Sequence, residues 1–256
     1  MEFNLKGKKA VITGGTRGIG RAIADRLAAE GVDVAICARN AAQVRDAVAA
    51  LRATGSNAFG SAVDIADGEA VKAWIAQAAE DLGGIDIAVA NPSAFGISNS
   101  EADWHNSFTV DLMAAVRMIG AATPFLEQAA ANTGDAAIVV VSSVLAAETE
   151  SESAYGAMKA ALTHFTKGVA RRLAPQGVRA NVISPGTIYV ADGFWGNAQK
   201  HMPEIYDTFL KRNPMGRMGR PQEIAQVAAF LASPLASFTT GANIVVDGAL
   251  TNRVPF

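Results

Sequence analysis

Three side chains in the middle of the chain have the types and the order that carbonyl reduction needs. Tyr155 and Lys159 are four residues apart in a stretch with a helical pattern, so they share one face of that helix. Ser143 ends the apolar run that precedes it. When a carbonyl carbon receives a hydride, charge develops on its oxygen, and a proton and hydrogen-bond donors stabilise that charge. A nearby ammonium favours a phenolate and lowers a tyrosine pKa. Because such a pair is often ordinary helix surface, its surroundings must decide.

The surroundings are those of a nucleotide-binding fold. Short Val/Ile/Ala-rich runs, which predict buried strands, alternate with longer amphipathic runs, which predict helices. The expected strands are 10–13, 32–37, 58–63, 85–90, 136–141, 178–183 and 242–246, and the expected helices are 19–30, 41–53, 67–82, 104–125, 153–173 and 221–232. This alternation is typical of a doubly wound parallel sheet with helices on both faces. We expect residues 1–256 to form a single domain.

A glycine-rich turn follows the first expected strand and opens the first helix. Residues 13–20 read TGGTRGIG. Glycines permit a tight turn and let a pyrophosphate approach the N–H groups at the helix N-terminus. A purely structural turn is the alternative, but the strand–turn–helix context favours dinucleotide binding. The residues expected to hold the phosphates are Gly14, Thr16, Arg17, Gly18, Ile19 and Gly20.

The end of the second strand predicts which dinucleotide binds. It reads Cys37-Ala38-Arg39, without the acidic residue that would bind a ribose 2′-hydroxyl. Arg39 and Arg17 can instead grip a 2′-phosphate, unless both are merely solvated surface arginines. NADP(H) is therefore the preferred cofactor and NAD(H) the alternative. Asp64, with Ile65 beside it, is placed to meet the adenine.

Composition excludes several other classes. The 256 residues carry a formal net charge of −2 and are 50% hydrophobic, so no global basic field invites nucleic acid. One cysteine excludes an internal disulfide, and three scattered histidines leave no zinc pattern, so no metal site is expected. Neither a signal peptide nor a bilayer-spanning apolar run is recognisable. We expect a cytoplasmic protein without a membrane partner.

Residues 187–213 break the alternation of strands and helices. This segment carries Phe194, Trp195, Met202, Tyr206 and Phe209. A connection of this length inside one domain is more often functional than a plain loop, so we expect a substrate lid at about 187–213. An oligomer contact is the alternative.

Together these motifs give a resemblance that spans nearly the whole chain. The chain resembles the short-chain dehydrogenase/reductase family in its glycine turn, Asp64, Ser143, the YGAMK run at 155–159 and the Pro185-Gly186 pair. It also ends like the family, with GAN at 241–243 and VVDG at 245–248. The resemblance implies a seven-stranded Rossmann sheet. It also implies that Ser143 polarises the carbonyl, Tyr155 is the acid/base, and Lys159 lowers the tyrosine pKa and binds ribose.

The resemblance extends to assembly and to further cofactor contacts. Family members are commonly homotetramers, so a homo-oligomer, tetramer or dimer, is expected. Asn91, Pro185, Gly186 and the backbone of Ile188 are expected to line the cofactor.

Three positions depart from the family pattern. The stretch after the fourth strand reads Ala90-Asn91-Pro92-Ser93, where Pro92 removes a backbone donor. Asp111 stands where an asparagine usually supports a water-borne proton relay, and its charge should raise the Tyr155 pKa. Val190 replaces a threonine that often bonds the carboxamide.

The sequence points to a small, partly apolar carbonyl or alcohol as the substrate. Within the family the broad similarity is to 3-oxoacyl-carrier-protein reductases, which is the alternative function. Carrier proteins are acidic, yet residues 118–170 contain only Lys159 and Lys167 as cations, residues 148–152 (ETESE) are acidic, and Gln176 stands where a basic residue is common. A non-redox nucleotide-binding regulator is a remote alternative, because it would normally lose the lysine or the glycine turn.

Overall fold

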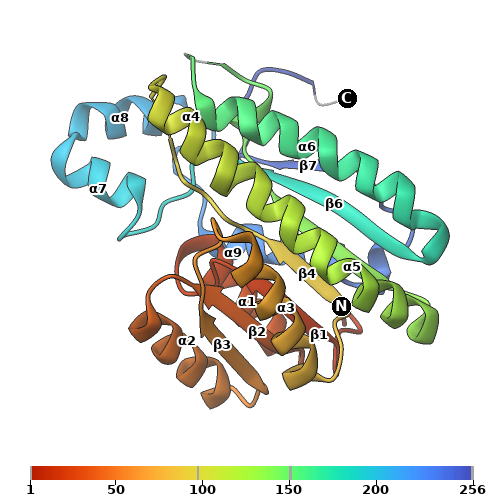
Figure 1. Ribbon diagram of the computed structural model, residues 1–256. Coiled ribbons are helices and arrows are strands. Elements are labelled where there is room, and N and C mark those ends of the chain that lie inside the picture. The colour runs from red at the N-terminus through yellow and green to blue at the C-terminus, as the bar shows by residue number, and fades with distance from the viewer. Residues whose placement is uncertain (1, 97, 150–151, 255–256) are drawn as a thin grey trace.

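The seven expected strands form one parallel sheet (Figure 1). The computed structural model describes residues 2–96, 98–149 and 152–254. The strands are β1 (Lys9–Thr13), β2 (Asp33–Ala38), β3 (Ala58–Ala62), β4 (Ile87–Ala90), β5 (Ala136–Val141), β6 (Val178–Pro185) and β7 (Asn243–Val246). Their order is β3-β2-β1-β4-β5-β6-β7. This is the doubly wound, single-domain Rossmann arrangement that the sequence predicts.

The register of the strands brings their carboxyl ends to one edge. Thr13 pairs with Cys37, and Ala90 pairs with Val140. Strands β4, β5 and β6 are buried throughout, and β4 and β5 accordingly consist of alanine, valine and isoleucine, while β6 also carries the buried polar residues Arg179, Asn181 and Ser184. The turns that leave β1, β4 and β5 therefore meet above the middle of the sheet, the usual ligand crevice of such folds.

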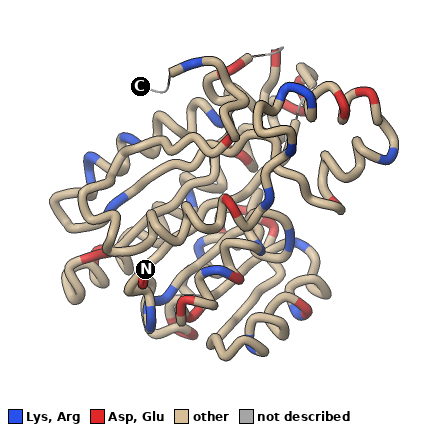
Figure 2. Tube along the Cα trace, turned by 180° about the vertical axis from the view of Figure 1, so that it is seen from behind, with Lys and Arg blue, Asp and Glu red and all other residues tan. Residues whose placement is uncertain are grey.

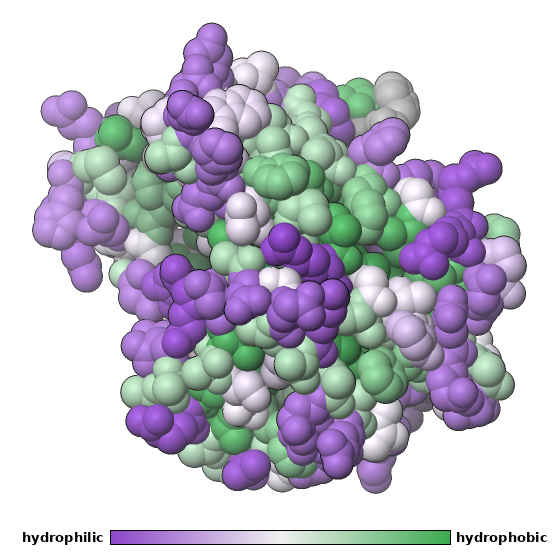
Figure 3. Space-filling view, in the orientation of Figure 1, coloured by the Kyte–Doolittle hydropathy of each residue, from purple (hydrophilic) through white to green (hydrophobic). Residues whose placement is uncertain are grey.

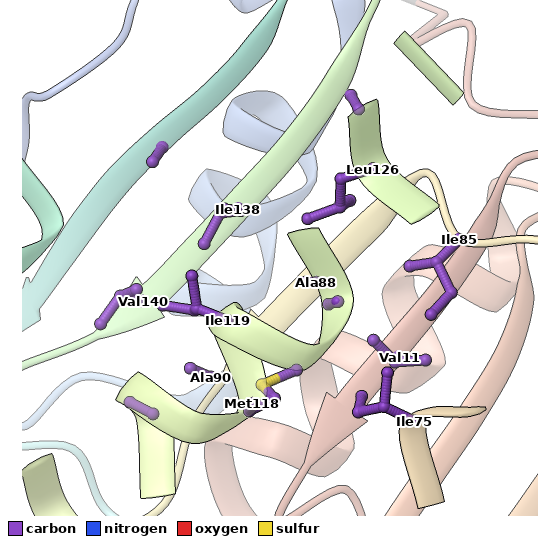
Figure 4. Close-up of a cluster of buried hydrophobic side chains, with 14 of the residues drawn as sticks. Val11, Ile75, Ile85, Ala88, Ala90, Met118, Ile119, Leu126, Ile138 and Val140 are labelled. Carbon is purple, nitrogen blue, oxygen red and sulfur yellow. The ribbon is translucent and has the colours of Figure 1, made fainter. Parts of the chain in front are cut away.

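Helices cover both faces of the sheet. Helices α1 (Gly18–Ala29), α2 (Ala41–Ala53) and α9 (Pro221–Ala232) pack on one face. Helices α3 (Gly68–Leu82), α5 (Ala114–Thr133) and α6 (Ala154–Leu173) pack on the other. Figure 4 shows this second core, where Ile75 of α3 and Met118 and Ile119 of α5 lie against strand residues such as Val11 and Ile138. Short 3-10 turns are formed by η2 (Val144–Ala146), η3 (Ala174–Gln176) and η4 (Pro234–Ala236).

The helix expected at 104–125 is longer than predicted and is interrupted. It begins as α4 (Glu101–Ser107), continues as the π-helical segment η1 (Phe108–Met113) and ends as α5 at Thr133. By length and apolar composition alone, the run Glu101–Thr133 is suited to cross a membrane. Here its apolar residues pack on β4 and β5 as part of the core, and the wider π turn places Asp111 in the interior.

The 187–213 segment folds into two further helices. They are α7 (Phe194–His201) and α8 (Pro203–Arg212), which pack on each other and project from the body of the molecule (Figure 1). The Thr187 hydroxyl donates to the Asn213 side-chain oxygen over 2.9 Å, so the two ends of the segment are held together. Its role as a substrate lid stays a prediction.

Candidate active site

The glycine turn is locked against the neighbouring strand and the start of α1. The Gly14 and Gly15 N–H groups donate to the Cys37 carbonyl, at 2.9 and 3.3 Å. A Cβ atom on Gly20 would lie 2.2 Å from the Gly14 carbonyl oxygen, so only glycine allows this close approach. Gly18 has a φ of 56°, which also favours glycine. The glycines are therefore required by the turn geometry.

The first turn of α1 suits an anion. Arg17 occupies the N-cap in an extended conformation, and its side chain makes no cap hydrogen bond. By contrast, Asn40 and Asp67 cap α2 and α3 with their side-chain oxygens. The first N–H groups of an α-helix lack partners within the helix and carry partial positive charge. The start of α1, around Thr16, Gly18 and Ile19, thus fits a pyrophosphate.

The two predicted phosphate-binding arginines lie at the same edge of the sheet. Arg17 is in the turn after β1, Arg39 follows β2, and both are exposed. Arg17 also donates from Nη1 to the Asp192 carbonyl over 3.4 Å, which links the glycine turn to the 187–213 segment. Figure 2 shows basic and acidic residues scattered over the molecule, with long uncharged stretches between them.

Asn91 has a further role that the sequence did not indicate. Its backbone N–H donates to Thr13 Oγ1 at 3.0 Å, and its Nδ2 donates to the Thr13 carbonyl at 3.5 Å. A Cβ on Gly14 or Gly20 would lie within 3.1 Å of Nδ2. The side chain therefore fastens β4 to the glycine turn, which places it on the predicted cofactor path.

The remaining predicted cofactor residues follow the carboxyl ends of β3 and β6. Asp64 is exposed, and its Oδ1 accepts from the Ala66 N–H at 3.0 Å. Ile65 packs on the α3/α5 core. Pro185 ends β6, the Gly186 N–H donates to the Val246 carbonyl at 3.0 Å, and Ile188 forms an isolated bridge with Gly219.

Ser143, Tyr155 and Lys159 come together at the carboxyl edge. Ser143 follows β5 and caps η2, where its Oγ accepts from the Leu145 N–H at 3.2 Å. Tyr155 lies in the first turn of α6, is buried, and is hydrogen-bonded to the Ser143 side chain. Lys159 is one turn further on, with 1% of its surface exposed. Its Nζ is 5.5 Å from the centre of the Tyr155 ring.

The Lys159 ammonium is held by three oxygens. It donates to the carbonyls of Pro92 at 3.1 Å and Val141 at 3.2 Å, and it lies 3.4 Å from Asp111 Oδ1. Asp111 is completely buried and also accepts from the Ala94 N–H at 3.3 Å. The carboxylate that was expected to support a proton relay is therefore placed in direct contact with the lysine.

The pKa of Tyr155 is shifted in the direction opposite to the lowering that the sequence led us to expect from Lys159. Burial raises the pKa of Tyr155 above its ordinary value, and the Asp111 charge raises it further, while hydrogen bonds from Ser143 and Ser93 act in the opposite direction. The predicted effect of Asp111 is confirmed in direction. The predicted lowering by Lys159 does not prevail, because the burial of Tyr155 is the largest cause and raises its pKa. Burial also lowers the pKa of Lys159, while Asp111 opposes that shift.

Phe95 is a site residue that sequence reasoning missed. Its ring centre is 5.3 Å from that of Tyr155 and 5.0 Å from that of Phe194. The row continues through Trp195 to Phe209, whereas the predicted lid residue Tyr206 pairs with Tyr189 instead. The available signal was position alone, because Phe95 follows Asn91 in the loop that leaves the carboxyl end of β4.

The described residues contain no group of three or more His, Cys, Asp or Glu side chains that could hold a metal ion. The one cysteine, Cys37, is buried, and burial raises the pKa of its thiol to about 12. A thiol with that pKa is not a nucleophile near neutral pH.

Comparisons with known proteins agree with this geometry. Residues 14–251 match a family model described as enoyl-(acyl carrier protein) reductase. The chain is 39% identical over 252 residues to the isoepoxydon dehydrogenase of Aspergillus clavatus, covering 96% of each. It resembles the L-sorbose reductase of Gluconobacter frateurii, solved with NADPH and L-sorbose, with a TM-score of 0.91, 29% identity and 99% and 100% of the two chains covered. A short-chain dehydrogenase of Burkholderia cenocepacia in complex with NADP gives a TM-score of 0.85, 32% identity and coverage of 96% and 98%.

Proposed function

The chain belongs to the short-chain dehydrogenase/reductase family of oxidoreductases, and from that premise we propose a specific activity for it. We propose that it is an NADP(H)-dependent enzyme that interconverts a carbonyl and a secondary alcohol on a small, partly apolar molecule. The observation that carries the proposal is the meeting of Ser143, Tyr155 and Lys159 at the same sheet edge as the glycine turn.

The cofactor site fits NADP(H). The start of α1 offers N–H groups that no cap side chain occupies. The glycines of the turn carry no Cβ atom, so a phosphate can approach the backbone closely. Arg39 and Arg17 supply cations where an acidic residue would favour NAD(H). Two structural neighbours were solved with NADPH or NADP. The proposed contacts are Gly14, Thr16, Arg17, Gly18, Ile19, Gly20, Arg39, Asp64, Ile65, Asn91, Tyr155, Lys159, Pro185, Gly186 and Ile188.

In the proposed reduction, the protein's own residues handle the proton. Bound NADPH supplies the hydride that the carbonyl carbon receives. The Tyr155 hydroxyl donates its proton to the carbonyl oxygen, and Ser143 donates a hydrogen bond to the same oxygen. The raised Tyr155 pKa keeps the hydroxyl protonated at neutral pH, which is the form that reduction requires.

Asp111 and Lys159 support the proton transfer from Tyr155. Burial lowers the pKa of Lys159, and Asp111, 3.4 Å from the lysine Nζ, opposes this shift and so favours the charged ammonium. The positive charge then stabilises the phenolate that proton transfer leaves.

The surface around the site favours a free small molecule over an acyl carrier protein. Lys159 is buried, so Lys167 is the one exposed cation between residues 118 and 170 of the described chain. Glu148 and Glu152 lie between η2, which follows Ser143, and α6, which carries Tyr155, while Glu150 and Ser151 of the predicted acidic stretch lie outside the described residues. Reduction of a 3-oxoacyl carrier protein remains the second candidate, because the matched family model is named for a carrier-protein reductase.

The direct test is a panel of ketones and secondary alcohols assayed with NADPH/NADP and NADH/NAD, alongside fluorescence measurement of NADPH binding. We expect NADPH binding in the micromolar range and turnover of at least one small ketone. No binding of either nucleotide would contradict the enzyme proposal. Tight NADPH binding with no turnover of any ketone, alcohol or acyl carrier substrate would point to a nucleotide-binding regulator instead.

We further propose that the protein is a cytoplasmic homo-oligomer, a tetramer or a dimer. Figure 3 shows hydrophobic surface over α5 and α6, where Phe125 and Phe165 are only partly buried. Gly120 and Gly168 on these helices have nothing within 4 Å of where a Cβ would lie, which permits close helix approach by a second copy. Sedimentation equilibrium at micromolar concentration tests this, and a purely monomeric protein would contradict it.

A further inference from the structure

Phe95 has a backbone conformation that a phenylalanine rarely adopts. Its φ is 54°, in the left-handed region, and among the described residues only Asn4 and Ala249 are other non-glycine positions with positive φ. Bulky side chains are disfavoured there, and such strain persists only where the surroundings enforce it. The strained residue lies beside Tyr155, so the strain occurs next to the reacting group.

Contacts on both sides of Phe95 enforce this conformation. The Ala94 N–H donates to the Asp111 carboxylate at 3.3 Å, and the Phe95 N–H donates to Ser93 Oγ at 3.1 Å. After Phe95, the Gly96 carbonyl accepts from the Tyr155 N–H at 3.1 Å. The loop is therefore fixed to η1 before Phe95 and to α6 after it.

Gly96 completes the constraint. A Cβ there would lie 2.8 Å from Ser107 Oγ and 3.2 Å from Asp103 Cβ, so the backbone is pressed against the α4 helix. Because both neighbours of Phe95 are held, its side chain is directed to one place. Asp111 thus holds the loop and also contacts Lys159.

The place to which the ring is directed is between the reactive tyrosine and the 187–213 segment. The Phe95 ring is tilted by 59° to Tyr155 and by 49° to Phe194, and 40% of the residue surface is exposed. An exposed aromatic ring at this point offers an apolar surface to whatever binds beside the Tyr155 hydroxyl.

We propose that Phe95 is a specificity-determining residue that selects flat, ring-containing carbonyl substrates over open-chain ones. This inference rests on the proposed function and names the substrate class of the same site. The substrate ring lies against Phe95 and Phe194 while its carbonyl oxygen meets Tyr155 and Ser143. An open-chain ketone of equal carbon number gains less binding free energy, because it lacks the ring contact and must lose torsional freedom to bind.

The test compares two six-carbon enones, cyclohex-2-enone and hex-3-en-2-one, in the wild-type protein and in Phe95→Leu. NADPH-dependent formation of the allylic alcohol gives kcat/KM for each. We expect wild type to prefer the cyclic ketone, and we expect Phe95→Leu to lower that preference about 3- to 10-fold, as expected for one aromatic contact, mainly through the cyclic ketone. Phe95→Gly, which accepts positive φ without strain, should lose the preference as well while staying folded.

Phe209→Leu is the matched control, because Phe209 belongs to the same aromatic row but contacts Trp195 rather than Tyr155. Phe209→Leu should change kcat/KM for both ketones by the same factor, so the preference for the cyclic ketone should stay as in wild type. An unchanged preference in Phe95→Leu, an equal loss for both ketones, or a wild-type protein that does not favour the cyclic ketone in turnover or in binding to the NADPH complex would overturn the proposal. Failure of wild type to bind NADPH would instead contradict the proposed function.

Discussion

Two clusters of charged and polar side chains lie at opposite ends of the same sheet, one partly buried at the amino end and one buried at the carboxyl end, and they are built differently. The amino-end network consists of Lys8, Asp86, Asp135 and Arg179. Arg179 donates to both Asp135 carboxylate oxygens, at 2.8 and 3.3 Å, and to the Leu231 and Ser233 carbonyls, at 2.7 and 3.0 Å. Lys8 lies 3.8 Å from Asp86 and 3.9 Å from Asp135. Each charge in this network has an opposite charge beside it.

The carboxyl-end cluster, Asp111, Ser143, Tyr155 and Lys159, also contains a buried ion pair. It differs in having a hydroxyl whose pKa is shifted, a π-helical turn and the strained Phe95 next to it. Perturbed titration and backbone strain concentrate at functional sites, whereas paired charges alone are common in structural networks. Burial of charge therefore does not distinguish a reactive site in this molecule, whereas backbone strain beside a titrating group does.

Cavity size does not distinguish the carboxyl-end cluster from the amino-end network either. A groove of about 830 Å³ opens at the amino end, lined by Lys8, Asp86, Arg179 and Phe238 among others. Lys8, Asp86 and Arg179 in this groove already form ion pairs within the amino-end network, so the volume of the groove alone is no evidence of a reactive site.

The largest expected effect comes from breaking the carboxyl-end pair. Lys159→Met leaves Asp111 buried without its cation, which should cost about 3–5 kcal/mol of unfolding free energy. It should also lower turnover at least about 100-fold, because it removes the charge beside Tyr155. The double variant Lys159→Met/Asp111→Asn should regain most of the stability but none of the turnover. Urea unfolding and NADPH-dependent assays measure both, and a double variant with restored turnover would contradict the account.

Breaking the amino-end network should affect stability alone. Arg179→Met leaves the partly buried Asp135 with only the more distant Lys8, and leaves the Leu231 and Ser233 carbonyls without their donor, so we expect a loss of about 1–3 kcal/mol in urea unfolding. At a temperature where the variant is folded, its kcat should equal that of wild type. A fall in kcat of more than a few fold would mean that the two ends of the sheet are coupled.

Cofactor choice should change when Arg39 is removed. Arg39→Ala should lower kcat/KM for NADPH about 10- to 100-fold, the value of one or two charge-assisted hydrogen bonds, and leave kcat/KM for NADH unchanged. Arg17→Ala should have a smaller effect on the same ratio, since Arg17 also binds the Asp192 carbonyl. Equal losses with both nucleotides would indicate that Arg39 does not read the 2′-phosphate.

The smallest expected effect is a displaced pH profile. After burial, the Asp111 charge is the next cause that raises the Tyr155 pKa. Reduction uses the protonated tyrosine, so its rate falls as pH rises through that pKa. Asp111→Asn should move this fall to lower pH, while Asp81→Asn on the exposed face of α3 should not. Superimposable profiles for wild type and Asp111→Asn would refute this role of the charge.

The pattern of the sequence predicts the sheet, the glycine turn and the Ser143–Tyr155–Lys159 set, because each depends on local periodicity or on the shared carboxyl edge of parallel strands. The Asp111–Lys159 contact was not predictable. It joins residues 48 positions apart and depends on a π turn within a helix that reads as regular. Phe95 escaped notice because phenylalanine gives no local signal for positive φ, and its contacts come from α6 and α7.

The central claim is that the carboxyl-end cluster does the chemistry through the Tyr155 hydroxyl. The direct measurement is single-turnover reduction of a ketone that wild type accepts, by Tyr155→Phe preloaded with NADPH. The account predicts NADPH binding within a few fold of wild type and a rate lowered about 10²- to 10⁴-fold, because the proton donor is lost. A Tyr155→Phe protein that binds NADPH and keeps the wild-type rate would contradict it.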